Sequence, residues 1–272
     1  MLKQRVTVGV IGAIFCIAIL CMDVRIISLV LALVAVIGLS EIYNATGILR
    51  EQNKLCVFSY AYTIITFIVI GFSENPAFAL GVMLFLYGFG LLSYLVFCHD
   101  KCDFSSIAGI FFQTLYVAFL FAHIILVRKL SYGNYIMWFI FVTAWLSDTL
   151  AYFVGIKFGR NKLIPAISPK KTIEGSIGGL AGSVIFNIIF ALVCSLGFDL
   201  SVNYFAVFFM AIIAGAMSQL GDLTASAIKR EYGIKDYSNL LPGHGGVMDR
   251  CDSILPTAMY GFLVMYIFNL VA

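Results

Sequence analysis

The chain has 272 residues, of which 62% are hydrophobic and 11% are charged, and its formal net charge is +3. Soluble domains are roughly 45–50% apolar and about 25% charged. This composition therefore excludes a soluble globular fold, and lipid has to be the solvent for most of the surface. The seven cysteines are odd in number and lie mostly within apolar runs, unlike a disulfide framework.

Nine apolar segments follow one another along the chain, each near or above the length needed to cross a bilayer. Lys3 and Arg5 precede the first segment, but no small-residue cleavage site follows it, so we expect a retained helix. The first two segments are short, at 17 and 18 residues, which leaves a re-entrant hairpin open. We predict an all-α, polytopic transmembrane helical bundle of about nine spans. The segments are 6–22, 26–43, 55–72, 77–97, 104–127, 133–156, 175–197, 204–225 and 254–271.

The distribution of positive charge predicts the orientation of this bundle. If the N-terminus is cytoplasmic, all but three of the 17 Lys and Arg residues lie on the cytoplasmic side. The exceptions are Arg25, Arg128 and Lys129. This asymmetry is the one that the positive-inside rule describes. We therefore expect an integral membrane protein whose active site faces the cytoplasm, and a bacterial inner or plasma membrane is its expected location.

Two cytoplasmic loops, about 157–174 and 226–253, hold most of the charge in the C-terminal half. The N-terminal part of the chain contains no comparable motif. We therefore predict an N-terminal transmembrane scaffold over 1–130 and a catalytic transmembrane region over 131–272, with the site on the cytoplasmic side.

The loop after the eighth segment interleaves carboxylates, cations and glycines. Such a mixture suits Mg²⁺ with a polyphosphate, because the metal bridges phosphate oxygens to Asp while Lys and Arg neutralise the remaining charge. Its glycines can bring backbone N–H groups close to a phosphate. The residues concerned are Asp222, Ser226, Lys229, Arg230, Lys235, Asp236, His244, Gly245, Gly246, Asp249, Arg250 and Asp252.

Further candidates lie upstream. Lys170 and Lys171 precede a predicted helix start, which is a natural anion site, although topology alone also places lysines there. Thr172 fits either this anion site or a helix cap. Asp148 and Asp222 lie within apolar segments, where an unpaired carboxylate costs about 2.5–3.5 kcal/mol on insertion scales. A structural role alone is therefore harder to accept for these two aspartates.

Two further features admit structural interpretations. Glu41, in the second segment, is either a helix-end carboxylate near the interface or part of a polar cavity. The glycines of the seventh segment are typical of close helix packing rather than of a ligand site. They are Gly175, Gly178, Gly179 and Gly182.

The spacing of the C-terminal motif resembles the signature of the phosphatidate cytidylyltransferase (CDP-diacylglycerol synthase) family. That signature has Ser, Lys-Arg, four residues, Lys-Asp, then Pro-x-His-Gly-Gly, Asp-Arg and Asp. The upstream stretches 148–152 and 168–175 also resemble the family, so the likeness is specific over about 145–255. The matching signature residues are Ser226, Lys229, Arg230, Lys235, Asp236, Pro242, His244, Gly245, Gly246, Asp249, Arg250 and Asp252.

The resemblance implies that CTP and phosphatidic acid react to give CDP-diacylglycerol and pyrophosphate, with Mg²⁺ and with a second cation left open. The phosphomonoester has a second pKa near about 6, so its oxygen is already nucleophilic at neutral pH. No protein nucleophile is therefore required. The implied partners are CTP, phosphatidic acid and the lipid bilayer, with no nucleic acid, and a homodimer is left open.

Residue roles follow from the same resemblance. The resemblance favours Asp222 and Asp249 as metal ligands, while Asp148, Asp236 and Asp252 are expected either to be secondary ligands or to orient bound water. Phosphate contacts are assigned to Lys229, Arg230, Arg250, Lys170, Lys171 and Thr172, with Ser226 also at the substrate site. Gly245 and Gly246 allow close backbone approach, and His244 bonds either phosphate or cytosine. We expect aspartates and basic side chains from separate helices to converge.

Three alternatives remain at this stage. A CTP-using kinase of a polyprenol or phytol would transfer the terminal phosphate to a hydroxyl and would need a base. A transporter or channel would place Glu41, Asp148 and Asp222 along a pathway. That function predicts polar residues spread to both faces of the membrane, whereas these candidates gather at the cytoplasmic ends. An inactive scaffold is disfavoured by the intact motif.

Overall fold

The computed structural model describes residues 2–271, and describes side chains from Thr7 onward with the exception of Val8. Packing divides the chain into two compact units. Unit 1 comprises Met1–Leu126 and Tyr232–Arg250, and unit 2 comprises Val127–Glu231 and Cys251–Ala272. The C-terminal signature is thus divided, because residues 232–250 belong to unit 1. The predicted roles of scaffold and catalytic region remain predictions.

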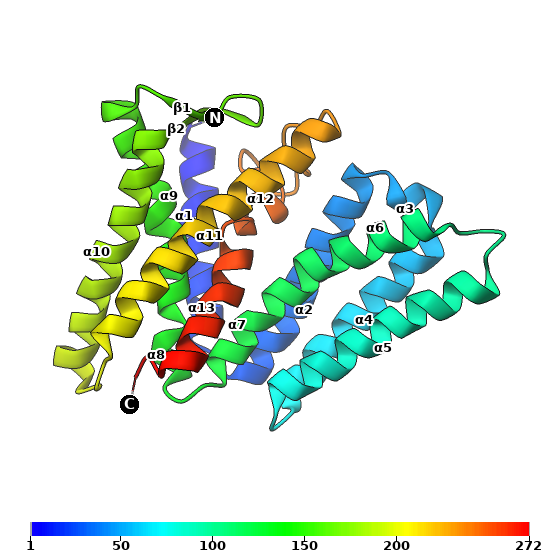
Figure 1. Cartoon of the computed structure of the whole chain (residues 1–272), viewed down its shortest axis with the longest axis horizontal. Coiled ribbons are helices and arrows are strands. Elements are labelled where there is room, and N and C mark those ends of the chain that lie inside the picture. Colours follow the sequence, from blue (N-terminus) through cyan, green and yellow to red (C-terminus); the bar gives the residue numbers. More distant parts are fainter. Residues whose placement is uncertain (1, 272) are drawn as a thin grey trace. The chain divides into compact units, whose positions relative to one another are not determined.

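Unit 1 is built from helices in which α2 packs against α4, and α4 against α5 (Figure 1). Asp23 and Asp103 begin α2 and α6 by accepting hydrogen bonds from the backbone N–H groups of Arg25 and Ser106, both at 2.9 Å. The elements are α1 (Leu2–Leu20), α2 (Val24–Ala45), α3 (Ile48–Glu51), α4 (Asn53–Phe72), α5 (Pro76–Phe97), α6 (Phe104–Thr114), the π-helix η1 (Leu115–Phe119) and α7 (Leu120–Arg128), whose end passes into unit 2.

A buried polar network ties the helices of unit 1 together. The Tyr87 hydroxyl lies 2.7 Å from both Ser59 Oγ and Thr114 Oγ1, and the Tyr43 hydroxyl also bonds Thr114. These contacts join α2, α4, α5 and α6. Hydrogen bonds between helices are one of the forces that hold helices together where lipid, rather than water, surrounds them.

Unit 2 is a second helical bundle, in which α9 packs closely against α10 and α11 packs against α13 (Figure 1). An added Cβ at Gly178 would lie 2.6 Å from Val154, and one at Gly182 would lie 2.0 Å from Leu150. The predicted packing role of these glycines is therefore confirmed. The elements are α8 (Gly133–Ile136), α9 (Trp138–Phe158), β1 (Lys162–Ile164), β2 (Ser168–Thr172), α10 (Ile173–Phe198), α11 (Tyr204–Glu231), α12 (Met248–Cys251, which begins in unit 1) and α13 (Ile254–Phe268).

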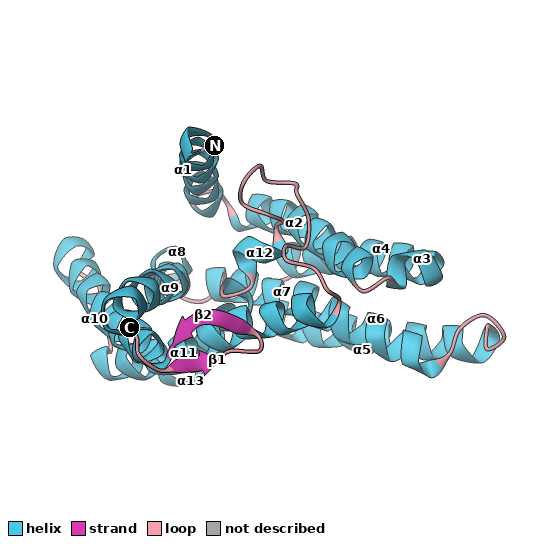
Figure 2. Ribbon diagram, turned by 90° about the horizontal axis from the view of Figure 1, so that it is seen from above, coloured by secondary structure: helices cyan, strands magenta, loops and turns pink. Residues whose placement is uncertain are grey.

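A small antiparallel sheet occupies the connection between α9 and α10, as the magenta strands of Figure 2 show. Lys162 pairs with Thr172, and Ile164 pairs with Ser168. The sequence pattern over 157–174 indicates only a loop, so these strands are a finding of the structure. They are short and exposed, so they lack the alternating apolar pattern that indicates a strand.

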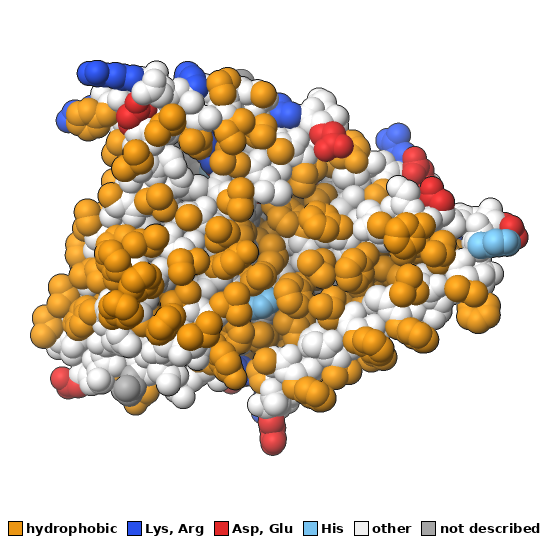
Figure 3. Space-filling model, in the orientation of Figure 1, with side chains coloured by type: hydrophobic (Ala, Val, Ile, Leu, Met, Phe, Trp, Pro, Cys, Tyr) orange, Lys and Arg blue, Asp and Glu red, His pale blue; other side chains and the backbone are white. Residues whose placement is uncertain are grey.

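The predicted all-α polytopic bundle is confirmed. Among the described residues, eight helices are long and apolar enough to cross a bilayer. The remaining predicted segment, 6–22, falls in α1, whose apolar part Gly9–Leu20 is shorter. Large apolar side chains are widely exposed, including Phe85 and Leu196, and they dominate the face drawn in Figure 3. Such exposure fits a lipid surround, and the chain is an integral membrane protein.

Candidate active site

Lys171 and Asp222 form a close ion pair in unit 2. Lys171 lies at the end of β2 and Asp222 lies on α11, and the Lys171 Nζ is 2.6 Å from Asp222 Oδ2. Their side chains are 27% and 28% exposed. Partial burial reduces screening by solvent, so this pair interacts more strongly than a fully exposed surface pair does.

Two more carboxylates join this pair. Asp148 Oδ2 accepts a hydrogen bond of 2.8 Å from Ser253 Oγ, and the Ser253 backbone N–H donates to Asp252 Oδ1 at 2.9 Å. Asp222 interacts electrostatically with both Asp148 and Asp252. Three carboxylates, from α9, from α11 and from the turn before α13, are thus brought together, and like charges repel unless cations compensate them.

Lysines provide that compensation. Lys171 acts on Asp148 as well as on Asp222, and Lys229, which is only 8% exposed, acts on Asp252. Lys229 lies on α11 two turns after Asp222, so both face the same side of that helix. Ser226, between them, donates a long hydrogen bond of 3.4 Å to Asp222 Oδ1. We call Asp148, Lys171, Asp222, Lys229 and Asp252 the carboxylate–lysine cluster.

Thr172 is the N-cap of α10. Its Oγ1 accepts a hydrogen bond of 3.1 Å from the Gly175 backbone N–H, and the residue is 8% exposed. The capping interpretation is thus confirmed, and contact with a substrate phosphate remains a prediction. The neighbouring Lys170 is exposed on β2.

Gln219, which lies one turn before Asp222 on α11, is not among the site residues predicted from the sequence. Its Nε2 donates to the Ser176 carbonyl at 2.9 Å and to Ser147 Oγ at 3.4 Å, and its Oε1 accepts from the Ser176 hydroxyl. Through Ser147 and Ser176, Gln219 therefore links α11 to α9 and α10. Ser147 directly precedes Asp148 in the chain, and Gln219 lies one turn from Asp222. A polar amide within the apolar segment 204–225 is the feature of the sequence that could have indicated this residue.

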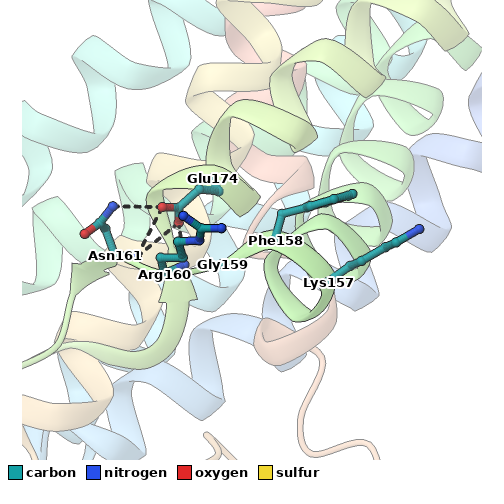
Figure 4. A pocket seen from close by; sticks show the side chains of 6 residues that line it. All are labelled: Lys157, Phe158, Gly159, Arg160, Asn161 and Glu174. Atoms are coloured by element: carbon teal, nitrogen blue, oxygen red, sulfur yellow. Dashed lines mark hydrogen bonds between the residues drawn. The ribbon is translucent and has the colours of Figure 1, made fainter.

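A pocket of about 590 Å³ lies where α9 ends and α10 begins (Figure 4). Glu174 accepts hydrogen bonds there from the backbone N–H groups of Arg160 and Asn161 and from Asn161 Nδ2, at 2.9–3.2 Å. Glu174 thus fixes the corner between α9 and β1. The pocket is lined by Lys157, Phe158, Gly159, Arg160, Asn161 and Glu174.

In unit 1, Asp249 closes on itself the segment 232–250, which runs into the start of α12 and is called the signature loop below. Its Oδ2 accepts the backbone N–H groups of Tyr237 at 2.8 Å and Gly246 at 2.9 Å. Gly245 has φ +80°, and an added Cβ there would lie 2.8 Å from the same oxygen. Asp249 is therefore a loop-organising residue in this structure. Its predicted metal role, shared with Asp222 of unit 2, remains a prediction.

The structure shows what Glu41 contacts. It is 5% exposed, and it accepts hydrogen bonds from Ser238 Oγ at 2.6 Å and from the backbone N–H groups of Val247 at 3.0 Å and Met248 at 2.8 Å. Neither of the two interpretations of Glu41, a helix-end carboxylate or part of a polar cavity, includes this contact with the signature loop.

His244 Nδ1 is buried without a hydrogen-bond partner among the described residues.

The other predicted site residues are exposed. Because long charged side chains at exposed positions can reorient, their phosphate or metal contacts remain predictions. They are Arg230 on α11, and Lys235, Asp236 and Arg250 in the signature loop.

The cluster has the donor chemistry that Mg²⁺ prefers, since all of its acidic ligands are carboxylate oxygens. As described, those carboxylates contact Lys171 and Ser253, and no group of three or more His, Cys, Asp or Glu side chains within the described residues is arranged to hold a metal ion. The residue types fit Mg²⁺, and binding of the ion is taken up below as a proposal.

The fold and the cluster define a polytopic helical membrane protein with a mixed carboxylate and lysine centre. Residues 3–268 match the sequence profile of the Cytidylyltransferase family, so the chain belongs to that family. This confirms the predicted resemblance and the predicted class of enzyme, a nucleotidyltransferase.

Relatives named phosphatidate cytidylyltransferase align over much of the chain. The protein of Staphylococcus haemolyticus is 33% identical over 258 residues, which covers 93% of this chain and 95% of the relative. The Bacillus subtilis protein is 36% identical over 180 residues, covering 66% and 65% of the two chains. The Thermotoga maritima protein is 36% identical over 167 residues, covering 60% and 61%. The last two alignments span just under two thirds of the relatives' lengths.

Proposed function

We propose that this protein is a phosphatidate cytidylyltransferase, which converts CTP and phosphatidic acid into CDP-diacylglycerol and pyrophosphate. The observation that carries the proposal is the carboxylate–lysine cluster, in which the Lys171–Asp222 pair is surrounded by Asp148, Asp252 and Lys229. A centre with both charges suits a reaction between two polyanions. The names of the relatives support the choice of substrates.

The chemistry needs no nucleophile from the protein. A phosphate oxygen of phosphatidate attacks the α-phosphorus of CTP, the bond from that phosphorus to the bridging oxygen breaks, and pyrophosphate leaves. The attacking group is largely dianionic at neutral pH, since its second pKa is about 6. The main obstacle is repulsion between the two substrates, which positioning and fixed positive charges reduce.

We propose that Lys171 and Lys229 supply those charges. Lys171 neutralises Asp222 in the structure described, and a substrate phosphate would compete for the same ammonium group. Lys229 is largely buried, so its charge is weakly screened and its long side chain is held in place. Arg230 and Arg250 are proposed to contact outer phosphate oxygens.

Asp148, Asp222 and Asp252 are proposed to hold Mg²⁺, and resemblance adds Asp249. When bound, the cation would neutralise phosphate charge and polarise the phosphorus–oxygen bond. The three aspartates are held by different segments, and Ser253 bonds Asp148 directly and Asp252 through its backbone N–H. Ser253 therefore fixes the spacing between these two carboxylates.

Orientation is proposed from charge. The positive-inside rule favours the cytoplasmic side for strand β2, which carries Lys171, and for the end of α11, which carries Lys229; CTP is available on that side. Phosphatidate would reach the centre from the inner leaflet.

Labelled substrates test the proposal. Purified protein in detergent is incubated with phosphatidate, Mg²⁺ and CTP labelled either in the cytosine or in the terminal phosphate. We expect cytosine label in the lipid and terminal-phosphate label in pyrophosphate. Terminal-phosphate label in the lipid would instead establish a kinase. Solute flux in proteoliposomes without either transfer would support a transporter.

A further inference from the structure

The signature loop of unit 1 is held by a carboxylate that lies far away in the sequence. Glu41 Oε1 accepts hydrogen bonds from Ser238 Oγ and the Val247 backbone N–H, and Glu41 Oε2 accepts one from the Met248 backbone N–H. Val247 and Glu41 are 206 residues apart. We propose that Glu41 is a positioning residue of the enzyme, acting through the loop that carries Asp249 and Arg250. This inference rests on the proposed function.

The chemistry of the contact requires a carboxylate. Three donors converge on two oxygens, so both oxygens must accept, and only an ionised Asp or Glu accepts at both positions. A glutamine at position 41 would present an NH₂ donor to at least one N–H or O–H donor of the loop. Hydrogen bonds to charged acceptors are also the stronger ones.

Gly246 makes the approach of Glu41 possible. Gly246 is buried, and an added Cβ there would lie 2.5 Å from Glu41 Oε2 and 2.6 Å from both Oε1 and Cδ. The absence of a side chain at this signature position is therefore explained by a carboxylate of the protein itself. The sequence alone favours a different reason for this glycine, the approach of a phosphate.

Glu41 and Asp249 together hold the loop at successive points. Glu41 binds the N–H groups of Val247 and Met248, while Asp249 binds those of Tyr237 and Gly246. Asp249 and Arg250 follow directly in the chain, so their backbone positions depend on the two bonds that Glu41 makes. Glu41 does not need to touch substrate in order to affect the reaction.

The helix that carries Glu41 is well packed within unit 1. Two residues after Glu41 on α2, Tyr43 is fully buried and bonds Thr114, within the polar network of unit 1. A carboxylate on so constrained a helix can determine where a loop lies. An exposed carboxylate on a mobile side chain could not.

The first test compares Glu41→Gln with Glu51→Gln, the same chemical change at an exposed position of α3. Both variants are purified, and kcat, KM for CTP and backbone hydrogen exchange over 236–249 are measured. We expect Glu41→Gln to lower kcat by at least about tenfold, the scale of one lost bond to a charged group, and to raise exchange in this segment. Glu51→Gln should stay within about twofold of the parent.

Separate readouts keep this inference distinct from the proposed function. Faster exchange with unchanged kcat and KM overturns the positioning role, as does unchanged exchange. If the parent enzyme lacks cytidylyl transfer, the proposed function fails, and hydrogen exchange still reports whether Glu41 holds the loop.

A second set of variants guards against a failure of Glu41→Gln to fold. Ser238→Ala removes one of the three bonds, and we expect a smaller loss of about two- to fivefold in kcat. Gly246→Ala should be severe alone but should add little to Glu41→Ala, because the clash partner is then gone. Additive effects of these two changes would overturn the contact as the reason for glycine at position 246.

Discussion

The ammonium group of Lys171 and the carboxylate of Asp222, separated by 2.6 Å, join the small sheet to helix α11 in unit 2. Asp222 lies in an apolar segment, and its pairing explains how such a carboxylate is tolerated there. The same pairing holds an ammonium group and a carboxylate side by side, and the proposed reaction uses the first for phosphate and the second for Mg²⁺. The ion pair stabilises the folded bundle, and we propose that it also serves the reaction.

Removing either member of this pair should impair cytidylyl transfer. We expect Asp222→Asn and Lys171→Ala each to lower kcat by at least about 100-fold, the range seen when one charge-stabilising group is lost. The double variant should be little worse than either single one, because residues in contact have non-additive effects. Labelled CTP incorporation into lipid measures all three.

Two matched controls separate this effect from general damage to unit 2. Asp199→Asn makes the same change at an exposed position with φ +53°, a conformation that Asn tolerates. Lys162→Ala removes an exposed lysine from β1 of the same sheet. Both should retain parental activity. Fully additive losses in the double variant would contradict a functional pair.

Asp249 allows its loop role to be distinguished from its predicted metal role. Asparagine keeps an oxygen that can accept from Tyr237 and Gly246, whereas alanine loses both bonds. If Asp249 also binds metal, Asp249→Asn should nearly abolish activity and leave hydrogen exchange over 236–249 unchanged. Asp249→Ala should lose activity and also increase that exchange. Near-normal activity of Asp249→Asn would remove the metal role.

Close packing of α9 and α10 should be sensitive to one added side chain. Gly182→Val places atoms where Leu150 now lies, and we expect a loss of about 1–3 kcal/mol in stability, seen as a lower Tm in detergent. Gly197→Val on the same helix is the control, because an added Cβ there meets nothing within 4 Å. Equal melting temperatures for the two variants would be inconsistent with the packing described.

Activity should depend on a divalent cation. Chelation with EDTA is expected to abolish transfer, and Mg²⁺ in excess should restore it, because the proposed ligands are all oxygens. In Asp222→Asn the Mg²⁺ concentration for half-maximal activity should rise. Full activity after exhaustive chelation would rule out the proposed ion.

The sequence by itself determined that lipid surrounds the chain, which class of fold it has and which family it belongs to. Hydropathy along the chain reports the medium that surrounds each segment, and the spacing of the signature is a local property, so both could be interpreted without coordinates. Thr172 as a cap and the packing glycines were accessible for the same reason. The short strands were not, because they lack an apolar alternation.

Only the tertiary structure decided which distant residues meet. Asp148, Lys171 and Asp222 come together because particular faces of α9 and α11 and the end of β2 are apposed. Glu41 was ambiguous in the sequence, and its role depends on a contact across 206 residues. Such contacts depend on how helices are rotated and where loops return, and hydropathy and spacing do not encode either property.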